Sequence, residues 1–520
     1  MTRQNSLHGL LRASTARSPE STVFIRRGRS TTYAELDLLS GRLASSLREL
    51  GVQQGHRVAL VLDNTVEYLV AYYGILKAGA VVVPLCPDTR TGTLSYALGH
   101  CEAKGVILDR KNAKLLDGQG DELPALHHVI SIGPPDLGAQ RFAVTELASL
   151  LETAEELHDT GAHGDDLASI IYTSGTTGHP KGAMLAHRNL VANVRSIVQY
   201  LELTPSDRIA MVLPFFYVYG NSVLHTHIHA GGSIAVLGSM AFPAAVLKGI
   251  QEQRCTGFSG VPSTFARLIQ FSALDQFDLG SLRYLTQAGG PMTPALTEKL
   301  KRAMPHVRVF VMYGQTEASA RLSYLPPADL ERKMGSAGIG IPGVTLRVMD
   351  KEGHEVPRGT VGEIVAQGDN VMLGYWKNPE ETERTLRPEG LRTGDLARMD
   401  EDGFIFIVAR ESDMIKSGAH RIGPKEIEDV VEKLPDVAQC AVVGVPDDLL
   451  GEAITAFVVL MKDASVTPKQ VLQICHDHLP KFKMPGHVRV VDSLPRTQTG
   501  KLRRNELKDW FASGKGLVEG

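Results

Sequence analysis

The sequence predicts an α/β protein with a large N-terminal domain of α/β subdomains, a small barrel-like β subdomain and a smaller α+β C-terminal domain. Three observations predict this class. The 520 residues exceed what one hydrophobic core usually supports. Up to about residue 335, short apolar runs alternate with helical patterns, as in parallel α/β sheets. Beyond that point Gly and Pro become frequent, and short strands replace this alternation.

The N-terminal part begins with a strand–helix–strand unit. "HRVALVLDN" (56–64) has the pattern of a buried strand, "TVEYLVAYYGILKAGA" (65–80) that of a helix, and "VVVPL" (81–85) that of a second strand. We expect Asn64 with Glu67 to cap this helix and Gly79 to end it. Strand, helix and strand in this order form a right-handed parallel unit. The strand pattern recurs at "GVILD" (105–109), "HHVISI" (127–132) and "ASIIYTSG" (168–175).

The C-terminal part shows two different sequence patterns. "TLRVMD" (345–350), "GEIVAQG" (362–368) and "FIFIVAR" (404–410) are typical of short antiparallel strands. A second, smaller helix-and-strand pattern starts after Arg410. We therefore predict one domain over 1–410 and another over 411–520.

Charge, apolar content and cysteine spacing disfavour several classes of protein. The chain is 43% apolar and 22% charged, with a formal net charge of −3, so nucleic acid is not an expected partner. No apolar run reaches the length of a membrane span. The five cysteines form no CxxC pair, which suits a cytoplasmic protein without disulfides or structural zinc. The arginines of the first 19 residues could belong to a transit peptide. We favour a surface helix with Leu7, Leu10 and Leu11 on one face.

One loop has the composition of a phosphate-binding loop. "YTSGTTGHPKGAM" (172–184) combines hydroxyl side chains with three glycines and Lys181. A Walker A loop requires GxxxxGK[ST], but Gly182 follows Lys181 here. No GxGxxG follows the first strand, which disfavours a dinucleotide site. Backbone N–H groups and hydroxyls in such a turn can still form an anion nest. The alternative is a surface loop that is merely rich in Ser and Gly.

Segments spread over nearly the whole chain make the sequence resemble the adenylate-forming enzymes. This family comprises acyl-CoA synthetases, peptide-synthetase adenylation domains and firefly-type luciferases. Each segment is a modest signal, but together they follow the family's order. They are "YTSGTTGHPKGAM" (172–184), "LPFFYVYG" (213–220), "QAGGPM" (287–292), "VMYGQTEAS" (311–319), "GEIVAQG" (362–368), "GYW" (374–376), "RTGDLARMDEDGFIFIVAR" (392–410), "IKSGAHRIGPKEIE" (415–428) and "LPRTQTGKLRR" (494–504).

The resemblance implies two half-reactions. A carboxylate attacks the α-phosphate of ATP to give acyl-AMP and pyrophosphate, and a thiol then takes the acyl group. Cations and donors must offset the repulsion between the two anions. Glu317 is the implied Mg²⁺ ligand, Tyr313 the implied adenine platform, and Asp395 with Arg410 the implied ribose site. The full implied ATP site is Thr173, Ser174, Gly175, Thr176, Thr177, Lys181, Gly289, Gly290, Tyr313, Gly314, Gln315, Thr316, Asp395, Arg410 and Lys501.

The resemblance makes Lys501 the catalytic lysine, with Thr316 and Glu317 beside the reacting phosphate. Lys501 would bridge the carboxylate and the α-phosphate in one orientation of a mobile C-terminal domain. A second orientation would bring Lys416, Ser417 and Gly418 to the thiol. The family's hinge is usually Asp or Lys, whereas this chain has Ser412, so the energetics of the rotation depart from the family's pattern.

The implied acyl pocket contains Tyr217, Val218, Gly289 and Gly314. The aspartate that binds an α-amino group in peptide-synthetase domains is absent, and Val218 replaces the asparagine of domains specific for 2-hydroxybenzoates. A fatty acid or an unsubstituted aromatic or aryl-alkyl acid remains, and the apolar segment favours a fatty acid. The three histidines between 225 and 229 could bind a metal, but we favour polar groups that line a helix.

Several functions stay open within this resemblance. The leading hypothesis is an AMP-forming acid–thiol ligase that uses ATP, Mg²⁺ and coenzyme A on a small-molecule carboxylic acid. An acyl-AMP ligase that loads the phosphopantetheine of an acyl carrier protein is the first alternative, and an aromatic-acid–CoA ligase the second. A luciferase-like oxidative enzyme has no supporting feature. A non-catalytic binding protein is disfavoured because Lys501, Glu317 and Asp395 are all present.

Overall fold

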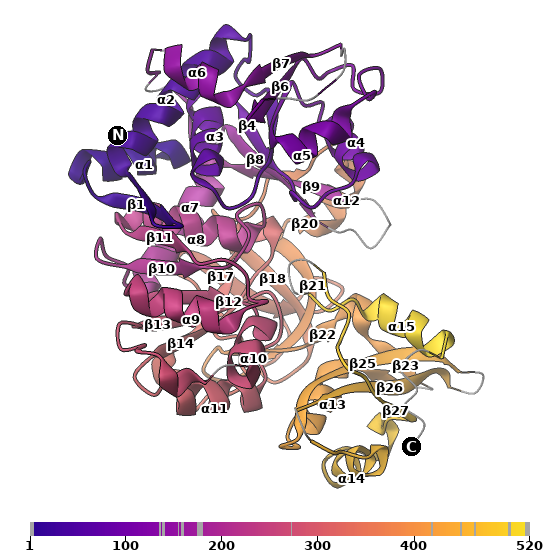
Figure 1. The fold of residues 1–520 in the computed structure, drawn as a ribbon. Coiled ribbons are helices and arrows are strands. Elements are labelled where there is room, and N and C mark those ends of the chain that lie inside the picture. The colour runs from indigo at the N-terminus through magenta and orange to yellow at the C-terminus, as the bar shows by residue number, and fades with distance from the viewer. Residues whose placement is uncertain are drawn as a thin grey trace.

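The computed structural model describes residues 5–134, 137, 141–153, 155–157, 161–173, 180–271, 273–417, 420–447, 450–461, 464–497 and 501–514. Within these ranges the strands form four sheets, and no helix there is long and apolar enough to cross a membrane. Figure 1 shows two large α/β layers in indigo to rose and a separate lobe in orange to yellow at the C-terminal end. The predicted α/β class is therefore confirmed.

An eight-stranded sheet forms from the first half of the chain, in the order β19-β9-β8-β4-β3-β5-β6-β7. The strands from β8 to β7 in this order are parallel, as the repeated strand–helix pattern predicts. Their bounds are β3 (Arg57–Val61), β4 (Val81–Pro84), β5 (Gly105–Asp109), β6 (His128–Ile132), β7 (Ala143–Glu146), β8 (Leu167–Thr173), β9 (Lys181–Ala186) and β19 (Gly374–Tyr375). The edge strand β19 comes from a much later part of the sequence and pairs with β9.

A nine-stranded sheet lies beside it, in the order β16-β15-β14-β13-β12-β10-β11-β1-β2. Its central strands from β14 to β1 are parallel, and an antiparallel hairpin closes each edge. The bounds are β1 (Thr22–Arg26), β2 (Arg29–Thr32), β10 (Arg208–Met211), β11 (Ser233–Val236), β12 (Gly257–Gly260), β13 (Tyr284–Gln287), β14 (Arg308–Tyr313), β15 (Ser323–Leu325) and β16 (Ile339–Gly340).

Helices pack between and around these two sheets. One continuous core joins Leu60 of β3, Tyr68 of α3, Met211 of β10 and Leu224 of α8, so both sheets bury apolar surface against a shared helical layer. Leu7, Leu10 and Leu11 are buried on α1, which confirms the predicted N-terminal helix. The bounds are α1 (Leu7–Arg17), α2 (Tyr33–Glu49), α3 (Val66–Lys77), α4 (Thr91–His100), α5 (Arg110–Ala113), α6 (Leu147–Thr153), α7 (His187–Leu201), α8 (Val218–Ala230), α9 (Pro243–Glu252), α10 (Pro262–Phe271), α11 (Pro294–Ala303) and α12 (Pro379–Thr385).

The start of α3 differs from the expected one. Thr65, not Asn64, is the cap, and its side chain accepts a hydrogen bond from the Tyr68 backbone N–H. Asn64 instead donates to the Leu213 carbonyl and accepts from the Phe215 N–H, both at 2.8 Å. It therefore ties the end of β3 to the segment before α8. Gly79 follows the helix end with φ +76°, as predicted.

The remaining two sheets divide the C-terminal part. The third is antiparallel and confirms the predicted barrel-like subdomain: β17 (Val344–Met349), β18 (Gly362–Gly368), β20 (Leu386–Arg387), β21 (Gly390–Met399) and β22 (Ile405–Arg410). The fourth contains β23 (Ile415–Ser417), β24 (His420–Ile422), β25 (Val437–Asp447), β26 (Gly451–Leu460) and β27 (His487–Val490), with α13 (Pro424–Val431), α14 (Pro468–His478) and α15 (Arg504–Ala512). The proposed domain boundary after Arg410 lies between these two sheets.

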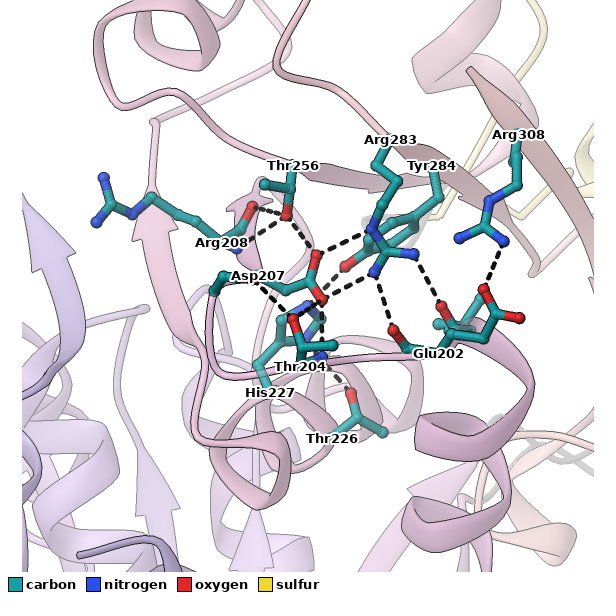
Figure 2. A network of polar contacts seen from close by, with 12 residues as sticks. Glu202, Thr204, Asp207, Arg208, Thr226, His227, Thr256, Arg283, Tyr284 and Arg308 are labelled. Atoms are coloured by element: carbon teal, nitrogen blue, oxygen red, sulfur yellow. Dashed lines mark hydrogen bonds and ion pairs between the residues drawn. The ribbon is translucent and has the colours of Figure 1, made fainter. Parts of the chain in front are cut away.

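A buried carboxylate anchors the amino ends of several strands of the nine-stranded sheet (Figure 2). Asp207, just before β10, accepts hydrogen bonds from the Thr204 N–H (2.8 Å), the Thr256 hydroxyl (2.8 Å) and the Arg283 guanidinium (2.8 Å). Burial opposes its ionisation, but the bonds from Arg283, Thr204 and Thr256 outweigh this and lower its pKa. Thr256 and Arg283 immediately precede β12 and β13, so Asp207 links the amino ends of β10, β12 and β13. The opposite ends of β12 and β13 contribute to the site described next.

Candidate active site

A cavity of about 380 Å³ lies where β12, β13 and β14 end. Ligands of open α/β sheets bind at the carboxyl ends of the strands, and the volume falls within the range of about 300–1,000 Å³ for small-molecule sites. The C-terminal domain contributes the opposite wall, including Glu428, Glu432, Arg496 and Lys501. The cavity is therefore completed by residues that are far apart in the sequence.

Tyr313, Asp395 and Arg410 form one hydrogen-bonded group in this cavity. The Tyr313 hydroxyl donates to Asp395 Oδ2 at 2.7 Å, and Arg410 Nε donates to Oδ1 at 3.0 Å. Asp395 and Arg410 are directly opposite each other on β21 and β22, whereas Tyr313 ends β14. Burial raises the pKa of Tyr313, and the Asp395 charge raises that of Arg410. A neutral aromatic ring, a carboxylate and a cation thus share one wall.

The segment after β14 is held in an unusual backbone conformation. Ser319 and Ala320 have φ values of 56° and 105°, which non-glycine residues rarely adopt. A Cβ on Gly314 would lie 2.1 Å from the Ala320 carbonyl oxygen, so only glycine fits there. Gln315 and Thr316 line the cavity. Asn370 donates to the carbonyls of Ala318 (3.1 Å) and Arg321 (2.9 Å), which anchors the segment.

Glu317 and Lys181 meet at Tyr375. The Tyr375 hydroxyl donates to Glu317 Oε1 at 2.8 Å, and Lys181 Nζ lies 5.5 Å from the centre of the Tyr375 ring. Lys181 also forms an ion pair with Glu381 at 2.6 Å, a partner that sequence reasoning missed. Glu317 is half-buried, and one carboxylate completed by phosphate oxygens is how Mg²⁺ commonly binds. Its donor type therefore fits the ion, although the described residues hold no cluster of three metal-ligating side chains.

The glycine-rich loop connects an antiparallel pair of strands. Thr173 ends β8 and faces Lys181, which begins β9. The loop thus follows a strand as predicted, but it leads into a second strand and not into a helix. Ser174, Gly175, Thr176 and Thr177 lie outside the described residues.

Lys501 lines the cavity close to Tyr217. Its ammonium nitrogen lies 5.7 Å from the centre of the Tyr217 ring, and both residues line the cavity together with Asp395 and Arg410. The Lys501 backbone is held by Thr497, which receives a bond at its hydroxyl (3.1 Å) and donates one from its N–H (2.8 Å).

The residues expected near the thiol lie elsewhere. Lys416 and Ser417 are on β23 and are not among the residues that line this cavity. Lys416 is exposed, and its backbone N–H donates to Glu452. Gly418 lies outside the described residues. The backbone at Ser412 belongs to the 3-10 helix η6 (Glu411–Asp413) between the third and fourth sheets, and its side chain is outside the description.

The expected acyl-pocket residues do come together. Tyr217, Val218, Gly289 and Gly314 all line the cavity. The nearby histidines bind tyrosines: His225 lies 2.7 Å from the Tyr73 hydroxyl and His227 lies 2.7 Å from that of Tyr284. Burial lowers the pKa of His225 to about 3 and that of His227 to about 4. These neutral, paired side chains fit the helix-lining interpretation.

Arg321 is one of several charged lining residues that the sequence motifs do not predict. It is 2% exposed and lines the cavity beside Tyr219 and Ala320. The available signal was an arginine placed between "YGQTEAS" and the strand "SYL". Nothing in that pattern indicates that its side chain turns inward.

Comparisons with known proteins agree with this geometry. The family model described as AMP-binding enzyme matches residues 11–376, and the AMP-binding enzyme C-terminal domain matches residues 426–501. The chain is 31% identical to a long-chain-fatty-acid–CoA ligase of Escherichia coli O6:H1, over 98% of this chain and 95% of the relative. It is 33% identical to a feruloyl-CoA synthase of an Amycolatopsis species, over 95% and 96% respectively.

Two solved structures share the whole fold. The ATP-bound MatB of Rhodopseudomonas palustris is 32% identical with a TM-score of 0.89, covering 99% of this chain and all of that one. The anthranilate CoA ligase AuaEII, in complex with anthranoyl-AMP, is 27% identical with a TM-score of 0.90 and 98% coverage of both chains.

Proposed function

The chain belongs to the adenylate-forming AMP-binding enzymes, and from that premise we propose how its own residues activate a carboxylic acid with ATP and pass the acyl group to coenzyme A. The observation that carries the proposal is the convergence of Lys501, Tyr217, Asp395 and Arg410 on one cavity. A mobile cation, an acyl-binding wall and a ribose-binding carboxylate are the parts that acyl-adenylate formation requires.

In the first half-reaction, the carboxylate attacks the α-phosphate of ATP and pyrophosphate leaves. Tyr313 supplies the adenine platform, and Asp395 accepts hydrogen bonds from the ribose hydroxyls while Arg410 holds it in place. Lys501 lines the same cavity as Tyr217, Asp395 and Arg410, and we propose that its positive charge offsets the repulsion of the two anions. Thr316 donates to the α-phosphate from the anchored segment after β14.

Lys181, Glu317 and the glycine-rich loop act on the departing pyrophosphate. Mg²⁺, when bound through Glu317, would neutralise phosphate charge. Tyr375 orients the Glu317 carboxylate through its hydroxyl. Lys181 is paired with Glu381, so we propose that the polyphosphate of ATP competes with Glu381 for this lysine. The loop residues Thr173, Ser174, Gly175, Thr176 and Thr177 complete this subsite.

In the second half-reaction, the thiol attacks the acyl carbon and AMP leaves. Lys416, Ser417 and Gly418 belong to this step and require a rotation of residues 411–520 about Ser412. We assign the present arrangement to the first half-reaction, because Lys501 lines the cavity and β23 does not. Coenzyme A is the proposed acceptor. The phosphopantetheine of an acyl carrier protein is the alternative, since it presents the same arm.

Two acid classes have specific support. The apolar segment that contains Tyr217 and Val218 supports a fatty acid, and one relative is a long-chain-fatty-acid–CoA ligase. However, the cavity lies near the lower end of the usual range of pocket volumes and must also hold the nucleotide. This supports a short acid. A feruloyl-CoA synthase among the relatives keeps an aromatic acid as the second class.

ATP–pyrophosphate exchange with a panel of acids tests the proposal. The panel contains straight-chain acids from four to sixteen carbons, benzoic and cinnamic acids, and short dicarboxylic acids. We expect acid-dependent exchange with at least one class, followed by thioester formation with coenzyme A. If exchange occurs but no thioester forms with coenzyme A, and a carrier protein is acylated instead, then the carrier protein is the acceptor. No exchange with any acid would refute the activity.

A further inference from the structure

Arg321 is a buried cation without an acidic partner in the described part of the chain. Its side chain is 2% exposed. Its guanidinium carbon lies 4.0 Å from the centre of the Tyr219 ring, Nε lies 3.4 Å from the sulfur of Met312, and a terminal nitrogen lies 3.4 Å from the Ala320 carbonyl. All of these neighbours are neutral. No described carboxylate forms an ion pair with it, in contrast to the buried Asp207, which has Arg283.

An unpaired buried charge lowers the stability of the folded protein. A buried charge is normally paired, and its five N–H donors require acceptors. The contacts with a thioether and with one carbonyl at 3.4 Å are weak, and the Tyr219 ring stabilises the cation only in part. The Tyr200 hydroxyl, which donates to the same Met312 sulfur at 3.0 Å, is a further neutral neighbour of the guanidinium. The guanidinium fork therefore retains donors that are suited to a carboxylate, which it can bind with two parallel hydrogen bonds.

The local backbone conformation determines the direction of the Arg321 side chain. Two consecutive residues with positive φ, Ser319 and Ala320, precede Arg321. Its carbonyl accepts hydrogen bonds from Asn193 (3.0 Å) and Asn370 (2.9 Å). Strained backbone that the surroundings hold in place is a common feature of functional sites. It lets the chain enter β15 while Arg321 lines the cavity.

We propose that Arg321 binds a second carboxylate on the substrate, so that the acid activated here is a short dicarboxylic acid. This inference rests on the proposed acid-activating function and names its substrate class. One carboxylate reacts near Lys501, and the other is bound by Arg321 at the wall formed by Tyr219 and Met312. An apolar tail of the same length would leave the guanidinium, which is 2% exposed, without an anion.

Matched acids test the inference. Succinate, glutarate and adipate are compared with 4-methylpentanoate, 5-methylhexanoate and 6-methylheptanoate, in which an isopropyl group replaces the second carboxylate at nearly the same size. Exchange rates are measured for the wild type, Arg321→Met, Arg321→Lys and the control Arg302→Met, which changes an exposed arginine of α11.

The wild type should prefer one of the dicarboxylates over its branched partner by about 100-fold or more in kcat/KM, because a site built for a polar group strongly rejects the analogue that lacks it. Arg321→Met should abolish this preference, because the rate with the dicarboxylate falls while the rate with the branched acid rises once no unpaired guanidinium opposes its isopropyl group. Arg321→Lys should retain part of it, since lysine keeps the charge but loses the fork. Arg302→Met should behave as the wild type.

Two results would overturn the inference and leave the acid-activating function intact. One is a wild-type preference for the branched or other monocarboxylic acids. The other is an equal effect of Arg321→Met on both series. If no acid supports exchange, the proposed function fails, and thermal denaturation decides the role of Arg321. Adipate should raise the melting temperature of the wild type more than that of Arg321→Met, and equal shifts would refute the assignment.

Discussion

Replacing Asp395 with asparagine should weaken ATP binding about 100-fold and leave the fold nearly unchanged. One lone pair of each Asp395 oxygen is engaged, by Tyr313 at 2.7 Å and by Arg410 at 3.0 Å. One on each remains for the two ribose hydroxyls. Asparagine removes the charge and turns one acceptor into a donor. A hydrogen bond to a charged group contributes about 1.5–3 kcal/mol. Losing one bond and weakening the other therefore costs about 3 kcal/mol, which corresponds to about 100-fold in affinity.

The effect on stability should be much smaller. The Arg410 side chain is 52% exposed, whereas that of Asp395 is 6% exposed. Asparagine keeps an oxygen that can accept one of the two bonds, so the loss should be about 1 kcal/mol, the usual net value of one hydrogen bond. Calorimetric titration of ATP and chemical denaturation separate the two quantities. Asp400→Asn is the matched control, because Asp400 lies at the end of the same hairpin, pairs with Lys333 at 2.6 Å and does not line the cavity. Unchanged ATP affinity in Asp395→Asn, or an equal loss in Asp400→Asn, would refute the reasoning.

Two further predictions concern carboxylates whose pKa values are shifted. Asp207→Ala should lower the free energy of unfolding by about 2–4 kcal/mol in urea, because it leaves the partly buried Arg283 without its partner; a change below 1 kcal/mol would contradict the role assigned to the network in Figure 2. Since the pKa of Asp207 is lowered, its contribution should be lost only as the pH falls below the usual aspartate value. Burial raises the pKa of Glu432 to about 7, so its contribution to stability should be full below the usual glutamate pKa and decline as the pH rises to 7. Glu432→Gln should flatten that decline in denaturation curves, and an identical pH profile for both proteins would exclude this contribution.

The strands and the overall order of the fold follow from local patterns in the sequence. Apolar runs such as "VVVPL" and the short strands after residue 335 are readable because burial on one or both faces dictates residue type. The first residue of a helix is harder to predict from the sequence. Both Asn64 and Thr65 are good caps, and the choice between them depends on Leu213 and Phe215, which are about 150 positions away.

The site is predictable only where its residues lie within motifs. Tyr313, Asp395 and Lys501 stand at motif positions, and the cavity brings them together. The pair of Lys181 with Glu381 joins residues 200 positions apart, and no local pattern indicates it. The inward orientation of Arg321 is unpredictable for the same reason. It results from the positive φ values of the two preceding residues and from the hydrogen bonds that Asn193 and Asn370 donate to its carbonyl. Long-range packing determines these features.

Lys501 is the residue on which acyl-adenylate formation most directly depends in the proposed mechanism. Lys501→Ala should reduce ATP–pyrophosphate exchange by at least about 100-fold, which corresponds to the loss of a charge aimed at the reacting phosphate, and should leave thioester formation from supplied acyl-AMP within about threefold of the wild type. Lys469→Ala, which removes an exposed lysine of α14 in the same domain, should change neither step. Equal loss of both half-reactions in Lys501→Ala, or unaltered exchange, would contradict the account.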